Sequence, residues 1–362
     1  MPEKKSVMPE NVSATPDCLQ RIPVLVDTAD LSEEEWLSYR RHGIGGSDVA
    51  AIFGISPFRT AADIYYDKLN INPVWEKEEN WIALKMGHLL EDLVAEIFHS
   101  KTDYPIFQLK KMFQHPAHPF MIADLDYLTI LPDGSISILE IKTTSCYAKD
   151  NWWRDGVEIV PSYYESQGRH YMAVTNISKI FFCCLPLGTT DVIIRELHRD
   201  LVYEEEMIYL EQNFWMNHVQ KQIPPPYTED GDIILASAKR HTGPADTQAP
   251  VLTFDMVTSA KVQRYLELKK AKDSSEFYSK QLKKDMDRLK AMIIADMGTS
   301  CTALCQSGGI SYTITTNPVR KSEINRDNLL RLKLQHPQLY QQFVTTSEYR
   351  RFNVKVLADD AA

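Results

Sequence analysis

Two apolar, extended segments around a Pro132-Asp133-Gly134 turn constrain the fold of this chain most strongly. The first, FMIADLDYLTIL, covers residues 120–131, and the second, SISILEIKTT, covers residues 135–144. Proline and glycine between two such runs are typical of a hairpin, and runs this rich in isoleucine and leucine are typical of buried strands. The chain is therefore predicted to contain a β-sheet core.

Helical patterns lie before and after these strands. Residues 81–98 carry apolar side chains at helical spacing, and Ser32 with Glu35 forms a capping box that begins an earlier helix. Further helices are expected over residues 60–69, 162–174 and 201–219, and further strands within residues 105–113, 177–187 and 190–197. The expected fold class is α/β, with a mixed central sheet flanked by helices.

The chain is expected to divide into four parts. Residues 1–30 are predicted to be a flexible lead-in, residues 31–222 the α/β core, and residues 223–255 a linker, because three consecutive prolines at 224–226 end any helix. Residues 256–362 are expected to form a helical or coiled-coil and β-hairpin subdomain. In it, apolar residues recur every three or four positions up to residue 297, and residues 308–316 and 350–357 look like paired strands.

The charge of the chain is distributed unevenly. The net charge of -9 weighs against a nucleic-acid partner, because phosphate binding is normally supported by a basic surface. Residues 251–362, however, carry 18 Lys and Arg against 12 Asp and Glu. Composition is therefore neutral on this point, since an acidic body with a basic tail is compatible with a local DNA-binding surface.

Cysteines and hydropathy suggest an intracellular setting. Six cysteines in 362 residues do not form a disulfide scaffold, so Cys183 and Cys184 are expected to be buried thiols. Cys301 and Cys305 form an isolated CxxxC, for which packing or a turn is favoured over a metal site. The N-terminus lacks the apolar stretch of a signal peptide, and no segment resembles a membrane span. A cytoplasmic protein without membrane contact is expected.

The strongest chemical signal is Asp126 on one strand and Glu140-Ile141-Lys142 on its neighbour. Alternation along a strand places Glu140 and Lys142 on one face and Ile141 on the other. Carboxylates suit a hard cation such as Mg2+ or Mn2+, and a lysine can orient or help to deprotonate an attacking water. The alternative is that these side chains lie on a solvated face of the hairpin. The apolar residues before Glu140 favour burial instead, and buried charges need a partner.

Two further residues are candidates for the same site. Glu91 lies at the edge of the apolar stripe of the helix at 81–98, four residues after Gly87, although a solvated Glu91 paired with Lys85 or His88 is an equal alternative. Gln167 lies in a helix expected to face the same sheet, where its amide can hold a water or a backbone group. Glutamines on helix surfaces are common, so Gln167 alone indicates little.

The segment RRHGIGGSD, residues 40–48, is a second signal. Glycines that tighten a turn, Ser47 at the start of the next helix and the adjacent Arg40 and Arg41 resemble an anion pocket, because free backbone N–H groups and the helix dipole favour phosphate. The alternative is an ordinary capped helix after a glycine turn. That alternative is favoured unless other features point to nucleic acid.

Five motifs in this order resemble the YqaJ-like viral recombinase family, which is related to lambda exonuclease and belongs to the PD-(D/E)XK nucleases. They are WLSYRRHGIGGSDVAAIFGISPF, MGHLLEDLVAEIF, MIADLDYLTI, ILEIKTT and YYESQGRHYMAV. The resemblance covers about residues 31–220, and the tail HPQLYQQFVTTSEYRRFNVK also looks like an extension of phage members. It implies a restriction-endonuclease-like core and a phage-type 5'-to-3' exonuclease that degrades linear duplex DNA in recombination.

The resemblance also implies roles for individual residues. Glu91, Asp126 and Glu140 would be metal carboxylates with the Ile141 carbonyl as an extra ligand, holding two Mg2+ or Mn2+ ions, and Lys142 would be the catalytic lysine. Gln167 matches the glutamine behind the site. Arg40 and Ser47 match residues that hold the terminal 5'-phosphate, with Arg41 as an adjacent candidate. The partners implied are double-stranded DNA ends, a single-strand annealing recombinase and further copies of the chain in a trimeric ring.

One departure from the family pattern leaves alternatives open. The usual Pro-Asp-Gly at the metal aspartate is here Leu125-Asp126-Tyr127, so Asp124 is a rival ligand expected to share a strand face with Asp126. The C-terminal subdomain also puts the ring in doubt. Rival functions are an endonuclease or helicase-linked nuclease of the same fold, and a DNA-end-binding scaffold with a residual site; an iron-sulfur relative of the Cas4 type lacks its cysteine cluster here.

Overall fold

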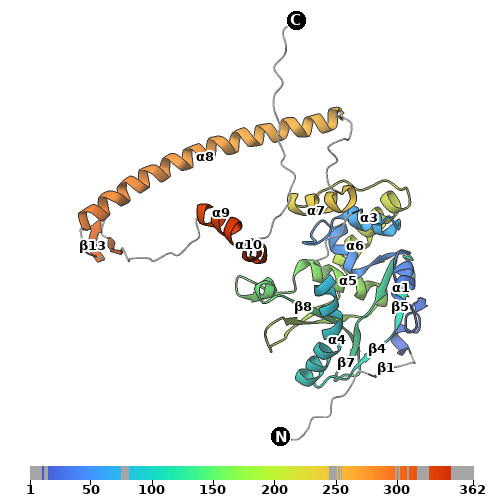
Figure 1. The fold of residues 1–362 in the computed structure, drawn as a ribbon. Coiled ribbons are helices and arrows are strands. Elements are labelled where there is room, and N and C mark those ends of the chain that lie inside the picture. Colours follow the sequence, from blue (N-terminus) through green and yellow to red (C-terminus); the bar gives the residue numbers. More distant parts are fainter. Residues whose placement is uncertain are drawn as a thin grey trace. The chain divides into compact units, whose positions relative to one another are not determined.

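The computed structural model describes residues 10–11, 15–74, 81–243, 251, 253, 255–297, 300, 302–307, 310–315 and 326–343. The chain forms two compact units, Met1–Pro244 and Ala245–Ala362 (Figure 1). The first unit contains the α/β fold and every candidate site residue. The second contains one long helix and smaller elements.

A mixed six-stranded sheet forms the centre of the first unit, in the order β1-β4-β7-β8-β11-β12. Strands β7 and β8 form the predicted hairpin, β8 and β11 run parallel, and β11 and β12 are antiparallel. The expected α/β fold with a mixed sheet is confirmed. The strands are β1 (Glu10–Asn11), β4 (Ile106–Gln108), β7 (Tyr127–Ile130), β8 (Ile136–Thr144), β11 (Lys179–Pro186) and β12 (Ile193–His198).

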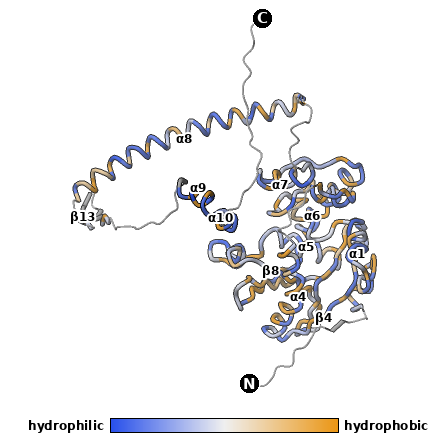
Figure 2. The backbone as a smooth tube through the Cα atoms, in the orientation of Figure 1, coloured by the Kyte–Doolittle hydropathy of each residue, from blue (hydrophilic) through white to orange (hydrophobic). Residues whose placement is uncertain are grey.

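Helices cover both faces of this sheet, because its strands alternate two sets of apolar side chains. On one face α4 (Trp81–Thr102) buries Val94 and Phe98 against Ile141 and other strand residues. On the opposite face α5 (Ser162–Thr175) packs closely, since a Cβ on its Gly168 would lie 2.7 Å from the Phe182 ring. The apolar segments accordingly gather inside the unit (Figure 2).

A second, four-stranded sheet has the order β2-β5-β6-β3. The sequence suggested that residues 105–113 and residues 120–131 are each one continuous strand. In the structure residues 105–113 divide into β4 and β5, and residues 120–131 divide into β6 and β7. The two strands of each pair belong to different sheets. The chain leaves one sheet and enters the other at Leu125 and Asp126. The strands are β2 (Val24–Asp27), β3 (Ile44–Gly45), β5 (Lys111–Gln114) and β6 (Met121–Asp124).

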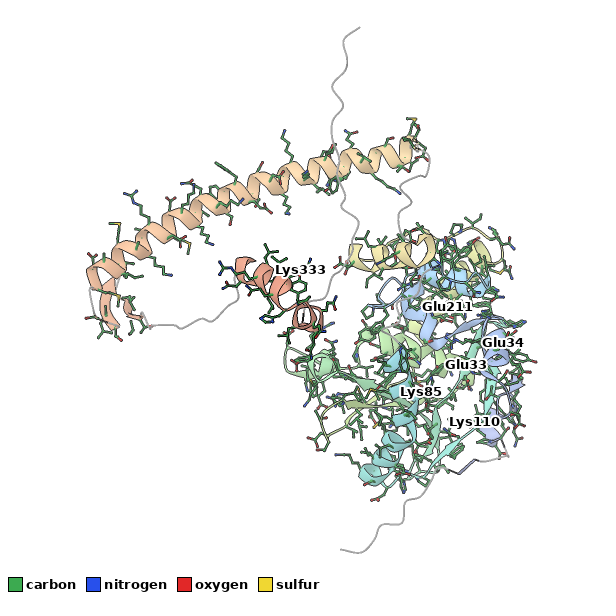
Figure 3. The ribbon with its side chains drawn as sticks, in the orientation of Figure 1. Glu33, Glu34, Lys85, Lys110, Glu211 and Lys333 are labelled. Carbon is green, nitrogen blue, oxygen red and sulfur yellow. The ribbon has the colours of Figure 1, made fainter. Side chains whose placement is uncertain are left out.

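Helices α2 (Gly46–Ile52) and α6 (Leu201–Phe214) of this unit pack on α5. A buried pair joins α5 to α6, which carries Glu211 (labelled in Figure 3). His170 Nδ1 lies 2.9 Å from Glu211 Oε1, and His170 Nε2 donates to the Ile122 carbonyl, also at 2.9 Å. Burial opposes the charged form of His170, but the charge of Glu211 and its hydrogen bond outweigh burial and raise the pKa of His170. The other helices are α1 (Glu33–Arg40) and α3 (Ala61–Lys68).

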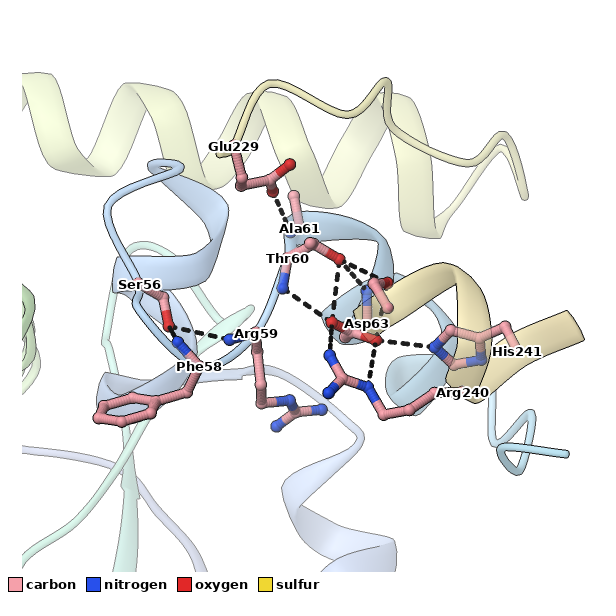
Figure 4. A network of polar contacts seen from close by, with 10 residues as sticks. Ser56, Phe58, Arg59, Thr60, Ala61, Asp63, Glu229, Arg240 and His241 are labelled. Atoms are coloured by element: carbon pink, nitrogen blue, oxygen red, sulfur yellow. Dashed lines mark hydrogen bonds and ion pairs between the residues drawn. The ribbon is translucent and has the colours of Figure 1, made fainter. Parts of the chain in front are cut away.

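The first unit extends beyond both of its expected boundaries. Within the predicted lead-in, Leu19 is fully buried and β2 pairs with β5. Within the predicted linker, α7 (Gly231–Thr242) docks on α3, where Asp63 accepts hydrogen bonds from Ser237 and Arg240 (Figure 4). The three prolines therefore end one helix without ending the compact unit.

The second unit is dominated by α8 (Met256–Met297), a 42-residue helix with no buried residue. It is followed by β13 (Thr302–Ser307), β14 (Ile310–Thr315), α9 (Arg326–Gln335) and α10 (Pro337–Phe343). Strand β14 pairs with β13. The expected strand at residues 350–357 lies outside the described residues, as does Cys301. In the part of the chain that the structure describes, no helix is both long and apolar enough to cross a membrane.

Candidate active site

Strand β8 presents Glu140 and Lys142 on one face, as alternation predicts. Glu140 is 2% exposed, and its Oε1 accepts a hydrogen bond from Lys142 Nζ at 2.6 Å. The intervening Ile141 packs into the apolar cluster on the opposite face. A carboxylate and a lysine thus emerge together from a core strand, and a solvated hairpin face is excluded.

Asp126 and Glu91 reach this pair from two other elements. Asp126 lies in the break between β6 and β7, where its Oδ2 accepts a hydrogen bond from the Ile141 backbone amide at 2.9 Å. Glu91 projects from α4 with 27% of its side chain exposed, and His88 Nδ1 lies 4.0 Å from its Oε2. Glu91 is thus near His88, as one alternative expected, and close enough to Asp126 for the charge of Asp126 to raise its pKa.

The carboxylates repel one another. Burial and then the charge of Asp126 raise the pKa of Glu140 to about 8, and the same two causes raise the pKa of Glu91 to about 7. Burial also raises the pKa of Asp126, although the Lys142 ammonium opposes this shift. The charges of Lys142 and Lys110 do not outweigh these effects, so the three carboxylates favour additional positive charge.

A hard cation fits the donors of this site. Glu140 Oε2 is buried and has no hydrogen-bond partner, and carboxylate oxygens are the ligands preferred by Mg2+ and Mn2+. Within the described residues, no three His, Cys, Asp or Glu side chains are already arranged as a metal site. Lys142 and Gln167 both donate to Oε1 of Glu140, so Oε2 is the oxygen of this carboxylate that is left for a cation.

Gln167 enters the site from α5. Its Nε2 donates to Glu140 Oε1 at 2.6 Å and lies 3.1 Å from the Tyr171 hydroxyl. The Lys142 ammonium lies 5.2 Å from the centroid of the Tyr164 ring, also on α5. Gln167 and Tyr164 therefore hold the two charged residues of β8 in place.

The glycine turn adjoins this site through α2. A Cβ at Gly46 would lie 2.5 Å from the Tyr171 ring and 3.0 Å from Gln167, so only glycine permits this approach of α2 to α5. Arg40 Nη2 donates to Ser47 Oγ at 2.6 Å and to Asp48 Oδ1 at 3.0 Å. The structure thus brings Arg40 and Ser47 together next to the carboxylates.

A buried aspartate organises this turn. Asp48 accepts hydrogen bonds from Arg40 and from the Gly45 amide, and Lys68 Nζ lies 2.8 Å from its Oδ2. Burial opposes the charge of Asp48, but Arg40 and Lys68 outweigh it and hold the pKa of Asp48 far below its usual range. The Gly45 amide is consequently not free to bind an anion, contrary to the expectation from the sequence.

Two candidates lie away from the central cluster. Arg41 Nε is 3.7 Å from Asp67 on α3, and the structure does not bring it to Ser47 through any recorded contact. Asp124 ends β6 and accepts a hydrogen bond from Trp36 Nε1 at 2.6 Å. Because the strand breaks after Asp124, this residue and Asp126 do not share a strand face, contrary to the expectation. Asp124 binds Trp36, whereas Asp126 binds the Ile141 amide.

Sequence reasoning missed three positions that matter here. Asp48 and Lys68 form the buried support of Arg40, and Lys110 lies between β4 and β5 (Figure 3), where its charge lowers the pKa of both Glu91 and Asp126. A buried aspartate at the third position of a helix is ordinarily read as a cap. Lys110 carried no signal, because its proximity depends on how the two sheets meet.

Comparison with known proteins identifies relatives of the chain. Residues 35–178 match the model of the YqaJ-like viral recombinase domain. A Bacillus subtilis (strain 168) protein, described as uncharacterized protein YqaJ, is 28% identical over 338 residues, which cover 93% of this chain and 98% of that protein. The similarity thus extends across both units.

Two solved structures resemble part of the chain. One is an alkaline exonuclease, LHK-Exo, from Laribacter hongkongensis, with 18% identity, a TM-score of 0.43 and coverage of 52% of this chain and 94% of that one. The other is a phage-related exonuclease from Haemophilus somnus 129PT, with 12% identity, a TM-score of 0.36 and coverage of 50% and 96%.

Proposed function

We propose that this protein is a deoxyribonuclease with a restriction-endonuclease-like core, because residues 35–178 match the YqaJ-like viral recombinase domain. It hydrolyses linear duplex DNA from its ends in the 5'-to-3' direction and acts in recombination. The observation that carries this proposal is the buried Glu140–Lys142 pair at the end of a core strand, next to Asp126 and Glu91. Paired carboxylates with a lysine suit phosphodiester hydrolysis.

Divalent metal would be held by Glu91, Asp126 and Glu140, with the Ile141 carbonyl as a further ligand. Two Mg2+ or Mn2+ ions would polarise the phosphate and lower the pKa of a bound water. Lys142 would then turn its ammonium from Glu140 toward the reacting water or phosphate, and Gln167 would keep Glu140 oriented. The unpartnered Oε2 of Glu140 supports this assignment.

Arg40 and Ser47 are proposed to hold the terminal 5'-phosphate, with Arg41 as an outer contact. Arg40 already donates to Ser47, and Asp48 with Lys68 keeps its guanidinium in place. A phosphate bound beside Ser47 would position the end of the strand next to Glu140, because α2 packs directly on α5. The clamp would thereby set the polarity of digestion.

The proposed partners are linear DNA ends, other copies of the chain and a single-strand annealing recombinase. A cytoplasmic location in a bacterial host would fit this role. The exposed apolar residues along α8 support oligomer formation, since Leu282, Met286, Leu289 and Ile293 follow a heptad spacing and each is at least 46% exposed. An annealing partner would bind the single strand that digestion leaves.

Digestion of defined substrates tests this function. Linear duplex DNA with a 5'-phosphate or a 5'-hydroxyl is incubated beside a closed circle, with Mg2+ or with EDTA. The proposal expects loss of linear DNA only in Mg2+, fastest with the 5'-phosphate, and an intact circle. Nicking of the circle would identify an endonuclease of the same fold, and binding without digestion would identify a DNA-end-binding scaffold.

A further inference from the structure

A row of aromatic rings connects an exposed loop to the catalytic lysine. We define the aromatic row as Phe58, Tyr163 and Tyr164. The Phe58 and Tyr163 ring centroids lie 6.0 Å apart in a T-shaped arrangement, and those of Tyr163 and Tyr164 lie 4.5 Å apart. Lys142 Nζ lies over Tyr164 at 5.2 Å. The row therefore begins at the surface and ends at the candidate active site.

The outer end of the row is accessible. Phe58 is 63% exposed, although one of its contacts is with Tyr163. The inner end is anchored, because the ring centroid of Tyr164 lies 5.8 Å from that of Trp152, a side chain that is 1% exposed. A single exposed aromatic residue is ordinary on a protein surface, but one joined through edge-to-face ring contacts to a buried core is held in a defined position.

The loop that carries Phe58 is itself ordered by hydrogen bonds. Ser56 Oγ accepts from the Phe58 amide at 3.1 Å and from the Arg59 amide at 3.2 Å. The Ser56 amide donates in turn to the Ala50 carbonyl of α2 at 3.0 Å. Because the loop is already ordered, the binding of a ligand to Phe58 costs little further conformational entropy of the loop and its side chains.

The loop also lies beside the proposed phosphate clamp. Arg59 is close enough to Asp48 for its charge to help lower the Asp48 pKa, after the larger effects of Arg40 and Lys68. No hydrogen bond or ion pair of the Arg59 guanidinium is recorded among the described residues. A strand that runs from the clamp to Lys142 would pass this loop, and every base of that strand offers a flat π-face.

We propose that Phe58 is a nucleobase-binding residue that stacks on an unpaired base near the 5' end of the DNA strand. This inference rests on the proposed nuclease function and adds a base contact to its phosphate contacts. Base stacking on an aromatic ring is tolerant of sequence, so the contact would stabilise an end opened for cleavage without selecting bases. Tyr163 and Tyr164 would support the ring and would not contact the base.

A fluorescent base tests the contact independently of cleavage. A duplex with an unpaired two-nucleotide 5' overhang, carrying 2-aminopurine at the second nucleotide, is bound in Ca2+, and the fluorescence of this base falls when it stacks. We expect strong quenching with the wild type and with Phe58→Trp, and weak quenching with Phe58→Ala and Phe58→Leu, because leucine is apolar but lacks a π-face. Tyr209→Ala removes an aromatic residue of α6 that is 69% exposed and is the matched control.

Affinity and digestion of the same duplex complete the test. Phe58→Ala and Phe58→Leu are expected to weaken DNA binding about tenfold and to raise KM more than they lower kcat. Equal quenching and equal affinity for Phe58→Leu and the wild type would overturn the inference while wild-type digestion still supports the nuclease. Absence of wild-type digestion with the quenching pattern intact would overturn the nuclease and leave the base contact standing.

Discussion

At the residue scale, the candidate site depends on how the charges of its buried side chains are compensated. Glu140 and Lys142 compensate each other within one strand, whereas Arg40 is held by a buried aspartate from the next helix. The first arrangement could be predicted, because alternation along a strand has a fixed period of two. The role of Asp48 could not, since it requires knowing that Lys68 from α3 reaches the same carboxylate.

Removal of Arg40 should reveal the clamp. Arg40→Ala is expected to lower kcat/KM on 5'-phosphorylated duplex DNA about ten- to hundredfold, because a charged hydrogen bond to phosphate is lost. The effect on 5'-hydroxyl DNA should be small, and the two substrates are compared in parallel steady-state assays. Arg154→Ala, which removes an exposed arginine of β9 (Trp153–Arg154), is the control. An equal loss on both substrates would contradict the assignment.

His115 should contribute to acid sensitivity. Its Nδ1 accepts from the Ala117 and His118 amides at 3.1 and 3.0 Å, so the folded protein requires the neutral ring; burial and then the charge of His118 lower the His115 pKa to about 4. The unfolded chain binds the proton first, near pH 6.5, so stability should fall as the pH drops from about 6.5 toward 4.

Replacement of His115 by Asn isolates this contribution. The Asn amide oxygen can accept the same backbone hydrogens but does not titrate. His115→Asn is therefore expected to flatten the dependence of unfolding free energy on pH in that window, as measured by urea denaturation at several pH values. An unchanged pH slope would show that other groups cause the acid sensitivity.

At the element scale, the break between β6 and β7 and the presence of α7 were the features hardest to predict from the sequence. The break between β6 and β7 has no glycine or proline to mark it, and it arises because residues on either side pair in different sheets. Helix α7 follows three prolines, and its docking depends on Asp63, far away in the sequence. Helix α4, by contrast, spans 22 residues with a clear apolar period, and its prediction is confirmed.

Asp63 should be essential for the attachment of α7 to α3. It caps α3 through the Thr60 amide and also binds Ser237, Arg240 and His241 (Figure 4). Asp63→Ala is expected to destabilise the protein by about 3 kcal/mol, since a buried network loses its shared acceptor. Thermal or urea unfolding measures the change. Glu205→Ala, at an exposed position of α6, should cost less than about 0.5 kcal/mol.

At the scale of the whole molecule, α8 is long enough to need a partner. None of its 42 residues is buried, and its apolar positions Leu282, Met286, Leu289 and Ile293 alternate spacings of four and three. Isoleucine and leucine at such positions favour self-association, and in a parallel pair Asp285 would lie opposite Lys290 of the other copy. The stripe was visible in the sequence, but the exposure of its residues within the second unit was not.

The oligomeric state should therefore depend on this stripe. Wild-type protein is expected to self-associate in light scattering coupled to size exclusion, and Leu289→Lys is expected to dissociate it. Phe277→Lys is the control, because Phe277 is 74% exposed but lies about 140° around the helix from Leu282. A monomeric wild type, or an oligomer that Leu289→Lys leaves intact, would contradict the role of α8.

The most direct test of the central claim is cleavage of 5'-phosphorylated linear DNA in Mg2+ by Lys142→Ala. Lys179→Ala, which changes a partly exposed lysine at the start of β11, serves as the control. The account predicts that Lys142→Ala lowers the rate at least about a hundredfold while DNA binding in Ca2+ is retained. Cleavage by Lys142→Ala at the wild-type rate would contradict the assignment of the active site to Glu140 and Lys142.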